Sequence, residues 1–279
     1  MEKENIIFQK KRDTGDIMSS TFTFLFQEFK PLLIKILIYF GPLGLISGFA
    51  TANYLSDIAN IMKWAKDDPS TFFSIFLRSY SLIILGIWLS YSMLTSVVLT
   101  YIALYIQKGR NGFSNDEFQQ RVFPTFLKVL VLSALLGILI IIGFIACIIP
   151  GIYLSISLSL VFPIIIFEKI TFSDAFNKSF TLTHYSWWWT FLLIVVCSVI
   201  TWVIGLIFSV PNMILTWLNM FQGSKGEDLT SSMKLATTIV AVITTFINSL
   251  LYTIPLVAIA FQYFNIRIQN GDLDTNTPQ

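Results

Sequence analysis

The sequence predicts an all-α polytopic integral membrane protein with about six transmembrane helices, arranged as three hairpin units with cytoplasmic amphipathic helices. Hydrophobic residues make up 55% of the 279 residues, charged residues only 12%, and the mean hydropathy is +0.73. Soluble domains carry about 25% charged residues, so lipid must solvate much of this chain. Six stretches are long and apolar enough to cross a hydrocarbon core about 30 Å thick, and their centres lack ionisable side chains.

The six apolar stretches belong to one predicted transmembrane domain over residues 16–270. A polar tail at 1–15 precedes this domain, and a second polar tail at 271–279 follows it. The first tail carries too many charges to open a signal peptide. The predicted spans cover about 32–54, 72–106, 126–149, 151–167, 187–210 and 235–264.

The distribution of basic residues predicts which side of the membrane each loop occupies. Placing both tails, the 107–125 loop, the 168–186 loop and the adjoining span ends on one side gives that side thirteen of the eighteen Lys and Arg residues. Basic residues concentrate on the cytoplasmic side of membrane proteins. We therefore expect both termini in the cytoplasm, and an even number of spans agrees with that.

The third and fourth spans meet at Pro150-Gly151. Proline ends a helix and glycine permits a tight reversal. This dipeptide therefore predicts a hairpin with almost no loop on the outer side of the membrane.

The chain also shows a threefold internal pattern. Each unit begins with a short amphipathic segment, at 16–30, 113–125 and 172–185. Two spans follow it, one crossing to the outer side of the membrane and one crossing back. Ser114 and Ser173 precede acidic residues, which predicts that each serine caps a helix N-terminus. Weak internal symmetry occurs in transporters, but duplication of a hairpin gives the same pattern.

Two further features belong to this pattern. The segments that follow the second and sixth spans, here called the returns, share a motif. It is Ile106-Gln107-Lys108-Gly109 after the second span and Ile268-Gln269-Asn270-Gly271 after the sixth. The opening at 16–30 is rich in phenylalanine, which favours a helix lying on the inner leaflet. The alternative is that this opening extends the first span.

Most polar side chains within the spans do not indicate a functional site. Ionisable residues at membrane depth usually mark transport pathways or active sites, and we predict no catalytic, cofactor-binding or metal-binding residues. Asn248 lies near the centre of the sixth span, so its amide needs a partner within the bundle. His184 is the only histidine, and it lies beside Trp187, Trp188 and Trp189, which are typical of a membrane-interface anchor.

A pattern in residues 149–189 resembles a known bacterial family. The pattern comprises Pro150, Gly151, Tyr153, Pro163, Glu168, Ala175, Ser179, Trp187 and Trp188. It is similar to the membrane-domain family named after the N-terminal part of some glycerophosphoryl diester phosphodiesterases, and to related inner-membrane proteins. The resemblance implies a multi-helix scaffold in the inner (cytoplasmic) membrane with a role near lipids. The family's phosphodiesterase chemistry lies in a separate soluble barrel of about 250 residues, for which this chain has no room.

The motif residues also have individual physical interpretations. Pro163 is expected to kink the fourth span. Glu168 follows at the cytoplasmic boundary, where it either pairs with Lys169, Lys178 or a neighbouring helix end, or remains an ordinary hydrated charge. Ala175 and Ser179 are four residues apart, on one helical face that suits close packing.

The function favoured by these observations is a non-enzymatic polytopic membrane scaffold, acting in lipid or membrane organisation or as a subunit of a membrane complex. The expected partners are membrane lipids and other membrane subunits, not nucleic acid, and no oligomeric state is predicted. The alternative is a transporter or permease subunit for a neutral or lipid-like substrate, because proline and glycine within spans permit broken helices. A membrane-embedded enzyme would require Glu168, Asp174 and His184 to converge on one pocket.

Overall fold

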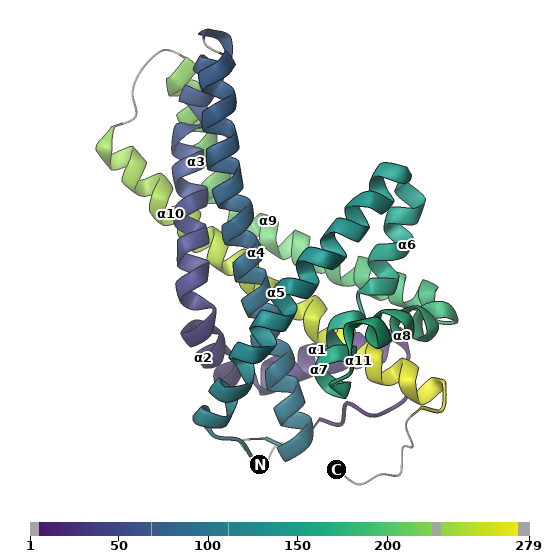
Figure 1. Ribbon diagram of the computed structural model, residues 1–279. Coiled ribbons are helices and arrows are strands. Elements are labelled where there is room, and N and C mark those ends of the chain that lie inside the picture. Colours follow the sequence, from purple (N-terminus) through teal and green to yellow (C-terminus); the bar gives the residue numbers. More distant parts are fainter. Residues whose placement is uncertain (1–5, 68, 111, 225–229, 273–279) are drawn as a thin grey trace. The chain divides into compact units, whose positions relative to one another are not determined.

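The computed structural model describes residues 6–67, 69–110, 112–224 and 230–272. Within these residues there is no β-strand, and the chain forms eleven α-helices (Figure 1), which confirms the all-α fold class. Parts of both predicted tails, residues 1–5 and 273–279, lie outside the described residues. The helices are α1 Thr14–Gln27, α2 Phe29–Tyr39, α3 Gly41–Asp67, α4 Pro69–Lys108, α5 Asn115–Ala146, α6 Ile148–Leu158, α7 Val161–Glu168, α8 Phe172–His184, α9 Trp187–Ser224, α10 Ser231–Leu251 and α11 Thr253–Gln269.

Helical segments long and apolar enough to cross a membrane confirm a multi-pass membrane protein. Among the described residues five segments qualify, and the bent pair Phe29–Tyr39 and Gly41–Tyr54 makes a sixth if it is counted as one span. This number agrees with the six predicted spans. The five segments are Tyr80–Lys108, Asn115–Ala146, Ile148–Glu168, Trp187–Gln222 and Ser231–Gln269.

The chain divides into two compact units, whereas the sequence analysis treated 16–270 as one domain. Unit 1 comprises Met1–Ile36, Ser92–Ile200 and Thr253–Gln279. Unit 2 comprises Leu37–Tyr91 and Thr201–Tyr252.

The core of unit 1 is built on aromatic side chains that join the N-terminal segment to α11. Phe8 stacks on Phe261 with ring centroids 4.1 Å apart, and Phe24 of α1 packs edge-on against Phe8 at 5.2 Å. All three side chains are completely buried. Aromatic pairs add about 0.5–1.5 kcal/mol beyond the area they bury, so this cluster ties α1 to α11.

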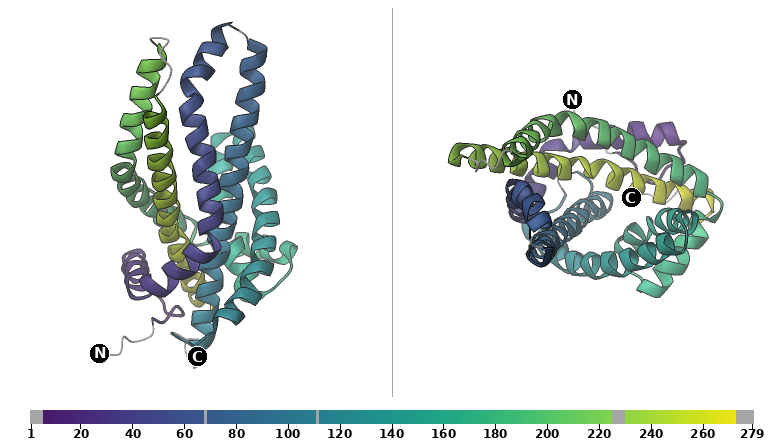
Figure 2. Two further views of the ribbon diagram at one scale, coloured as in Figure 1. Left: turned by 90° about the vertical axis from the view of Figure 1, so that its left-hand side faces the viewer. Right: turned by 90° about the horizontal axis from the view of Figure 1, so that it is seen from above.

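Unit 2 contains the packed pair α3 and α10 (Figure 2). A Cβ placed on Gly48 would lie 3.0 Å from the Val242 backbone, so the two helices approach too closely for a larger residue. Phe40 and Phe246 close the same contact with centroids 5.4 Å apart. Small residues permit such approach where lipid gives helices no hydrophobic reason to associate.

Four helix breaks share one cause. Pro31, Pro150, Pro163 and Pro255 are each the third residue of the helix that follows the break. A proline ring clashes with the carbonyl four residues earlier but is tolerated in the first helical turn, where its missing N–H has no partner to lose. The preceding helix therefore ends four or five residues before each proline. At Pro163, where a kink is expected, the helix is interrupted for two residues between α6 and α7, within the single apolar segment Ile148–Glu168.

The position of the hairpin break differs from the prediction at Pro150-Gly151. Helix α5 ends at Ala146, extended Cys147 makes the turn, and both Pro150 and Gly151 lie inside α6. Gly151 serves packing instead of reversal, because a Cβ there would lie 2.5 Å from the Phe144 ring. The predicted α5–α6 hairpin itself is present in unit 1 (Figure 1).

Helix α9 extends further than predicted. The fifth span was expected to end at Val210, before Pro211, but α9 continues through Pro211 to Ser224. Prolines persist inside membrane helices because neighbouring groups compensate the freed backbone. The sequence rule that proline ends a helix therefore failed at this position.

The three predicted openings differ in form. The first and third are helices of their own, α1 and α8, whereas the second is the start of the continuous helix α5. Ser114 caps α5 as predicted, accepting from the Glu117 N–H at 3.2 Å. The cap predicted at Ser173 was wrong, because extended Thr171 precedes the helix and accepts from the Asp174 N–H at 3.3 Å.

The predicted similarity of the two returns is present in the backbone. Gly109 follows α4 with φ 73°, and Gly271 lies two residues after α11 with φ 77°. Glycine adopts this left-handed conformation without a steric penalty and often terminates helices. Aligning the two motifs also makes Tyr101 of α4 equivalent to Tyr263 of α11, since each lies five residues before the isoleucine.

Candidate functional site: a polar pocket beside helix α11

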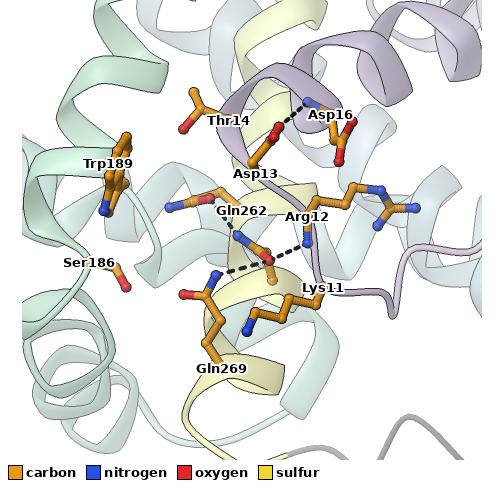
Figure 3. Close-up of a pocket in the computed structure, with 10 residues that line it drawn as sticks. Lys11, Arg12, Asp13, Thr14, Asp16, Ser186, Trp189, Gln262 and Gln269 are labelled. Atoms are coloured by element: carbon orange, nitrogen blue, oxygen red, sulfur yellow. Dashed lines mark hydrogen bonds between the residues drawn. The ribbon is translucent and has the colours of Figure 1, made fainter.

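A polar pocket of about 340 Å³ lies in unit 1, beside α11. The N-terminal segment, the start of α9 and one face of α11 form its walls (Figure 3). The lining residues are Lys11, Arg12, Asp13, Thr14, Asp16, Ser186, Trp189, Gln262, Asn265 and Gln269.

Three amides of α11 form a ladder along the pocket. The Gln269 amide nitrogen donates to Asn265 Oδ1 at 3.4 Å, and the Asn265 amide nitrogen donates to Gln262 Oε1 at 3.5 Å. Gln262 in turn donates to Thr190 Oγ1 at 3.0 Å. Spacings of three and four residues place these amides on one helical face. The ladder links α9 to α11 along the polar pocket.

Arg12 fixes the N-terminal wall of the pocket. Its backbone N–H donates to Asn265 Oδ1 at 2.8 Å, and its guanidinium donates to Ser20 and to the Phe8 carbonyl, both at 3.0 Å. The guanidinium carbon also lies 5.0 Å from the Phe261 ring centroid. Burial lowers the pKa of Arg12, and the charge of Asp16 opposes this shift. These contacts make Arg12 a structural element of the pocket wall.

The chemistry available in the pocket is hydrogen bonding. Its amides, the Ser186 hydroxyl and the Trp189 indole present neutral donors and acceptors, while Lys11 and Asp16 contribute opposite charges. Asp13 accepts from the Asp16 N–H at 2.7 Å as the N-cap of α1. The pocket therefore suits a neutral or zwitterionic polar group. The sequence analysis missed Asn265 and Gln269, although the spacing of 262, 265 and 269 was a detectable signal.

Glu168 is held by two hydrogen-bond donors and one further basic side chain, from two other helices. Lys178 Nζ of α8 lies 2.7 Å from one carboxylate oxygen, and the Tyr263 hydroxyl donates to the other at 2.6 Å. Arg267 lies 3.4 Å from the same carboxylate. The expected tie between Glu168 and the helix that follows it is therefore present, with Lys178 as the basic partner.

A second buried carboxylate, Glu28, was not identified as a site from the sequence. It lies at the break between α1 and α2, accepts from the Tyr101 hydroxyl at 2.7 Å and has Arg110 Nε at 3.0 Å. Its side chain is completely buried. An acid within a phenylalanine-rich segment, directly before Lys30-Pro31, was the available signal.

The remaining residues of the family-like pattern contribute to packing around α8. Ala175 and Ser179 are completely buried, as their shared face predicts. Tyr153 stacks on Trp187 at 5.8 Å and accepts from its indole N–H through the backbone carbonyl at 3.5 Å. Trp188 is exposed, at 73% of its full area, as a side chain that anchors in lipid headgroups would be.

Asn248 has the partner that its position requires. In unit 2 its amide nitrogen donates to the Ser209 hydroxyl of α9 at 3.1 Å. A Cβ on Gly205 would lie 2.9 Å from Asn248 Oδ1, so the amide packs directly against that glycine. Asn248 therefore joins α10 to α9.

The acids and histidine that an enzyme would need have separate neighbours. Asp174 is bonded to Thr171 at the start of α8, and His184 at the other end contacts Tyr185. Glu168 is engaged by Lys178 and Tyr263. Within the described ranges no three His, Cys, Asp or Glu side chains gather as metal ligands, and Cys147 and Cys197 do not form a disulfide.

No protein-family model, curated protein or solved structure matches this chain. The resemblance of residues 149–189 to the phosphodiesterase membrane-domain family therefore stays a prediction.

Proposed function

We propose that the chain is a non-enzymatic polytopic scaffold of the inner membrane, which acts in lipid or membrane organisation or as a subunit of a membrane complex. The observation that carries this proposal is that the side chains of Glu28 and Glu168 are both engaged in hydrogen bonds and ion pairs with other segments of the chain. A general acid or base must present its proton to a bound substrate. These carboxylates instead accept hydrogen bonds from tyrosine and lysine side chains and form ion pairs with arginine side chains.

The surface supports the same proposal. Large apolar side chains on α5, α6 and α9 are exposed, among them Ile145, Ile149, Trp202 and Trp217. Contiguous exposed apolar area marks contact with lipid or with another membrane protein. The thirteen-to-five distribution of basic residues supports cytoplasmic termini.

The test is extraction of the chain with its surrounding membrane into polymer-bounded nanodiscs, followed by native mass spectrometry. We expect either one lipid class enriched over the bulk membrane or a second subunit at a fixed ratio. Recovery of a lone chain with the lipid composition of the bulk membrane would overturn the proposal.

A transporter for a neutral or lipid-like substrate is the second candidate. The amide-lined pocket beside α11 favours it, together with the proline breaks that leave backbone groups free near a site. Gln262→Leu with Asn265→Leu would remove the polar wall. A transporter predicts that this variant stops uptake of a neutral solute by reconstituted vesicles, whereas a scaffold predicts no uptake by either protein.

A further inference from the structure

A second crevice in unit 1 lies between α4, α5 and α7 and has a volume of about 340 Å³. Ile165 and Ile166 of α7 give it an apolar wall. Arg121 and Lys128 of α5, with Lys169 just after α7, give it a basic wall. A space that is apolar on one side and cationic on the other suits an amphipathic anion.

The positive charge of this crevice is not balanced within it. Its lining contains three basic residues and no acid. Arg121 pairs with Glu117 outside the lining at 2.9 Å. Among the described residues neither Lys128 nor Lys169 takes part in a salt bridge. Two ammonium groups therefore remain for an external anion.

The backbone at Lys169 separates two neighbouring charges. Lys169 has φ 57° and ψ 32°, and its N–H donates to the Ile165 carbonyl at 3.1 Å. A lysine in the left-handed region is uncommon and strained. Because of this turn, the Glu168 side chain contacts Lys178 and Tyr263, whereas Lys169 lines the crevice. Of the two lysine partners that the sequence suggested for Glu168, the structure therefore shows Lys178 and not Lys169.

A buried hydroxyl provides independent evidence for a ligand. Thr100 of α4 lines the crevice, is 2% exposed, and its Oγ1 has no hydrogen-bond partner among the described residues. A buried polar group without a partner is unfavourable. Rotation of the Thr100 side chain toward the crevice would let a phosphate oxygen accept this hydrogen bond.

We propose that this crevice binds the phosphate headgroup of an anionic phospholipid, with an acyl chain along Ile165 and Ile166. The inference rests on the lipid part of the proposed function. The shared chemistry is a phosphate ester, and the apolar wall favours a lipid over a free phosphate. In the predicted orientation the crevice faces the cytoplasmic leaflet, where anionic lipids attract basic residues.

The experiment titrates short-chain phosphatidylglycerol into the detergent-solubilised full chain and measures binding by native mass spectrometry. Lys128→Gln with Lys169→Gln is the test variant. Because each basic residue at an anionic membrane surface strengthens binding about fivefold, we expect about a thirtyfold loss of affinity. Thr100→Val should weaken binding by a smaller factor. Lys128→Arg with Lys169→Arg, which keeps both charges, should bind like the wild type.

The matched control is Lys30→Gln with Lys234→Gln, which removes the same charge from exposed positions outside the crevice. This control should keep wild-type affinity. Equal losses in test and control variants, or no preference for phosphatidylglycerol over phosphatidylcholine, would overturn the proposal. So would displacement of the lipid by millimolar inorganic phosphate, which would make the ligand a free anion. If the test variant loses phosphatidylglycerol but still retains the lipids or subunit found in native nanodiscs, the crevice is confirmed separately from the scaffold.

Discussion

Glu28 and Glu168 each accept a hydrogen bond from a tyrosine, and the two tyrosines occupy equivalent positions in the repeat. Tyr101 and Tyr263 both lie five residues before the isoleucine of their return. The carboxylates, however, come from different points of the chain, one from the α1–α2 break and one from the end of α7. The repeated helix therefore supplies the same donor twice, and each time a different segment supplies the acceptor.

The Glu28 cluster and the Glu168 cluster, each a carboxylate with its partner side chains, also differ in burial and in the number of these partners. The Glu28 side chain is 0% exposed and has Tyr101 and Arg110. The Glu168 side chain is 13% exposed and has Lys178, Tyr263 and Arg267. A buried charge is costly without its partners, whereas a partly hydrated charge can turn to water. The smaller, fully buried Glu28 cluster should therefore contribute more to stability than the Glu168 cluster.

The largest effect is expected from Glu28→Ala. Removing the buried carboxylate leaves the Tyr101 hydroxyl without an acceptor and Arg110 without its counter-charge, which should lower the free energy of unfolding by about 3 kcal/mol. Unfolding in mixed micelles of increasing denaturing detergent measures the change. Glu28→Gln, which can still accept from Tyr101, should be less harmful, and equal losses for both variants would contradict the role assigned to the hydrogen bond.

Glu168→Ala should have the second-largest effect, about 2 kcal/mol in the same unfolding measurement, because water can solvate Lys178 and Arg267 once the carboxylate is gone. The comparison fails if this loss exceeds that of Glu28→Ala. The double variant should show nearly additive losses, since the clusters share no residue.

The two tyrosine hydroxyls should also differ in their contribution to stability. Tyr101→Phe should lower the free energy of unfolding by about 1.5 kcal/mol, and Tyr263→Phe by about 1 kcal/mol, because Glu168 keeps two basic partners whereas Glu28 keeps one. A larger loss at Tyr263 would contradict the role assigned to burial, and equal losses would show that the equivalent repeat positions give the two bonds the same value.

How much of this could be predicted from the sequence differs between helices and sites. Composition and hydropathy were sufficient for the fold class and for six apolar stretches, because lipid demands long apolar helices. Helix breaks were predictable in principle from Pro31 and Pro255, which stand three residues into new helices. Pro211 obeys no such rule, since its consequences depend on neighbouring groups that the sequence does not identify.

The sites were less predictable. The amide ladder at 262, 265 and 269 lies on one helix, so its spacing alone could have shown it. The basic crevice combines α4, α5 and α7, and no local pattern reveals which side chains of three helices meet. Whether Glu168 would select Lys169 or Lys178 depended on a single left-handed backbone conformation.

The smallest expected effect is that of salt. Raising the salt concentration from 0.1 M to 1 M shortens the Debye length from about 10 Å to about 3 Å. This change should lower the free energy of unfolding by about 0.5 kcal/mol through the partly exposed Glu168 cluster. The Glu168→Ala variant should show a smaller salt dependence, since the exposed Glu117 pairs remain, and Glu28→Ala should retain the full effect.

We propose that the interior carboxylates Glu28 and Glu168 hold helices together and perform no chemistry. The most direct measurement replaces both at once, Glu28→Gln with Glu168→Gln, and compares the variant with the wild type by native mass spectrometry from nanodiscs. We predict that the folded variant retains the same enriched lipid class or subunit as the wild type. A variant that folds normally but loses that lipid or subunit would contradict the claim.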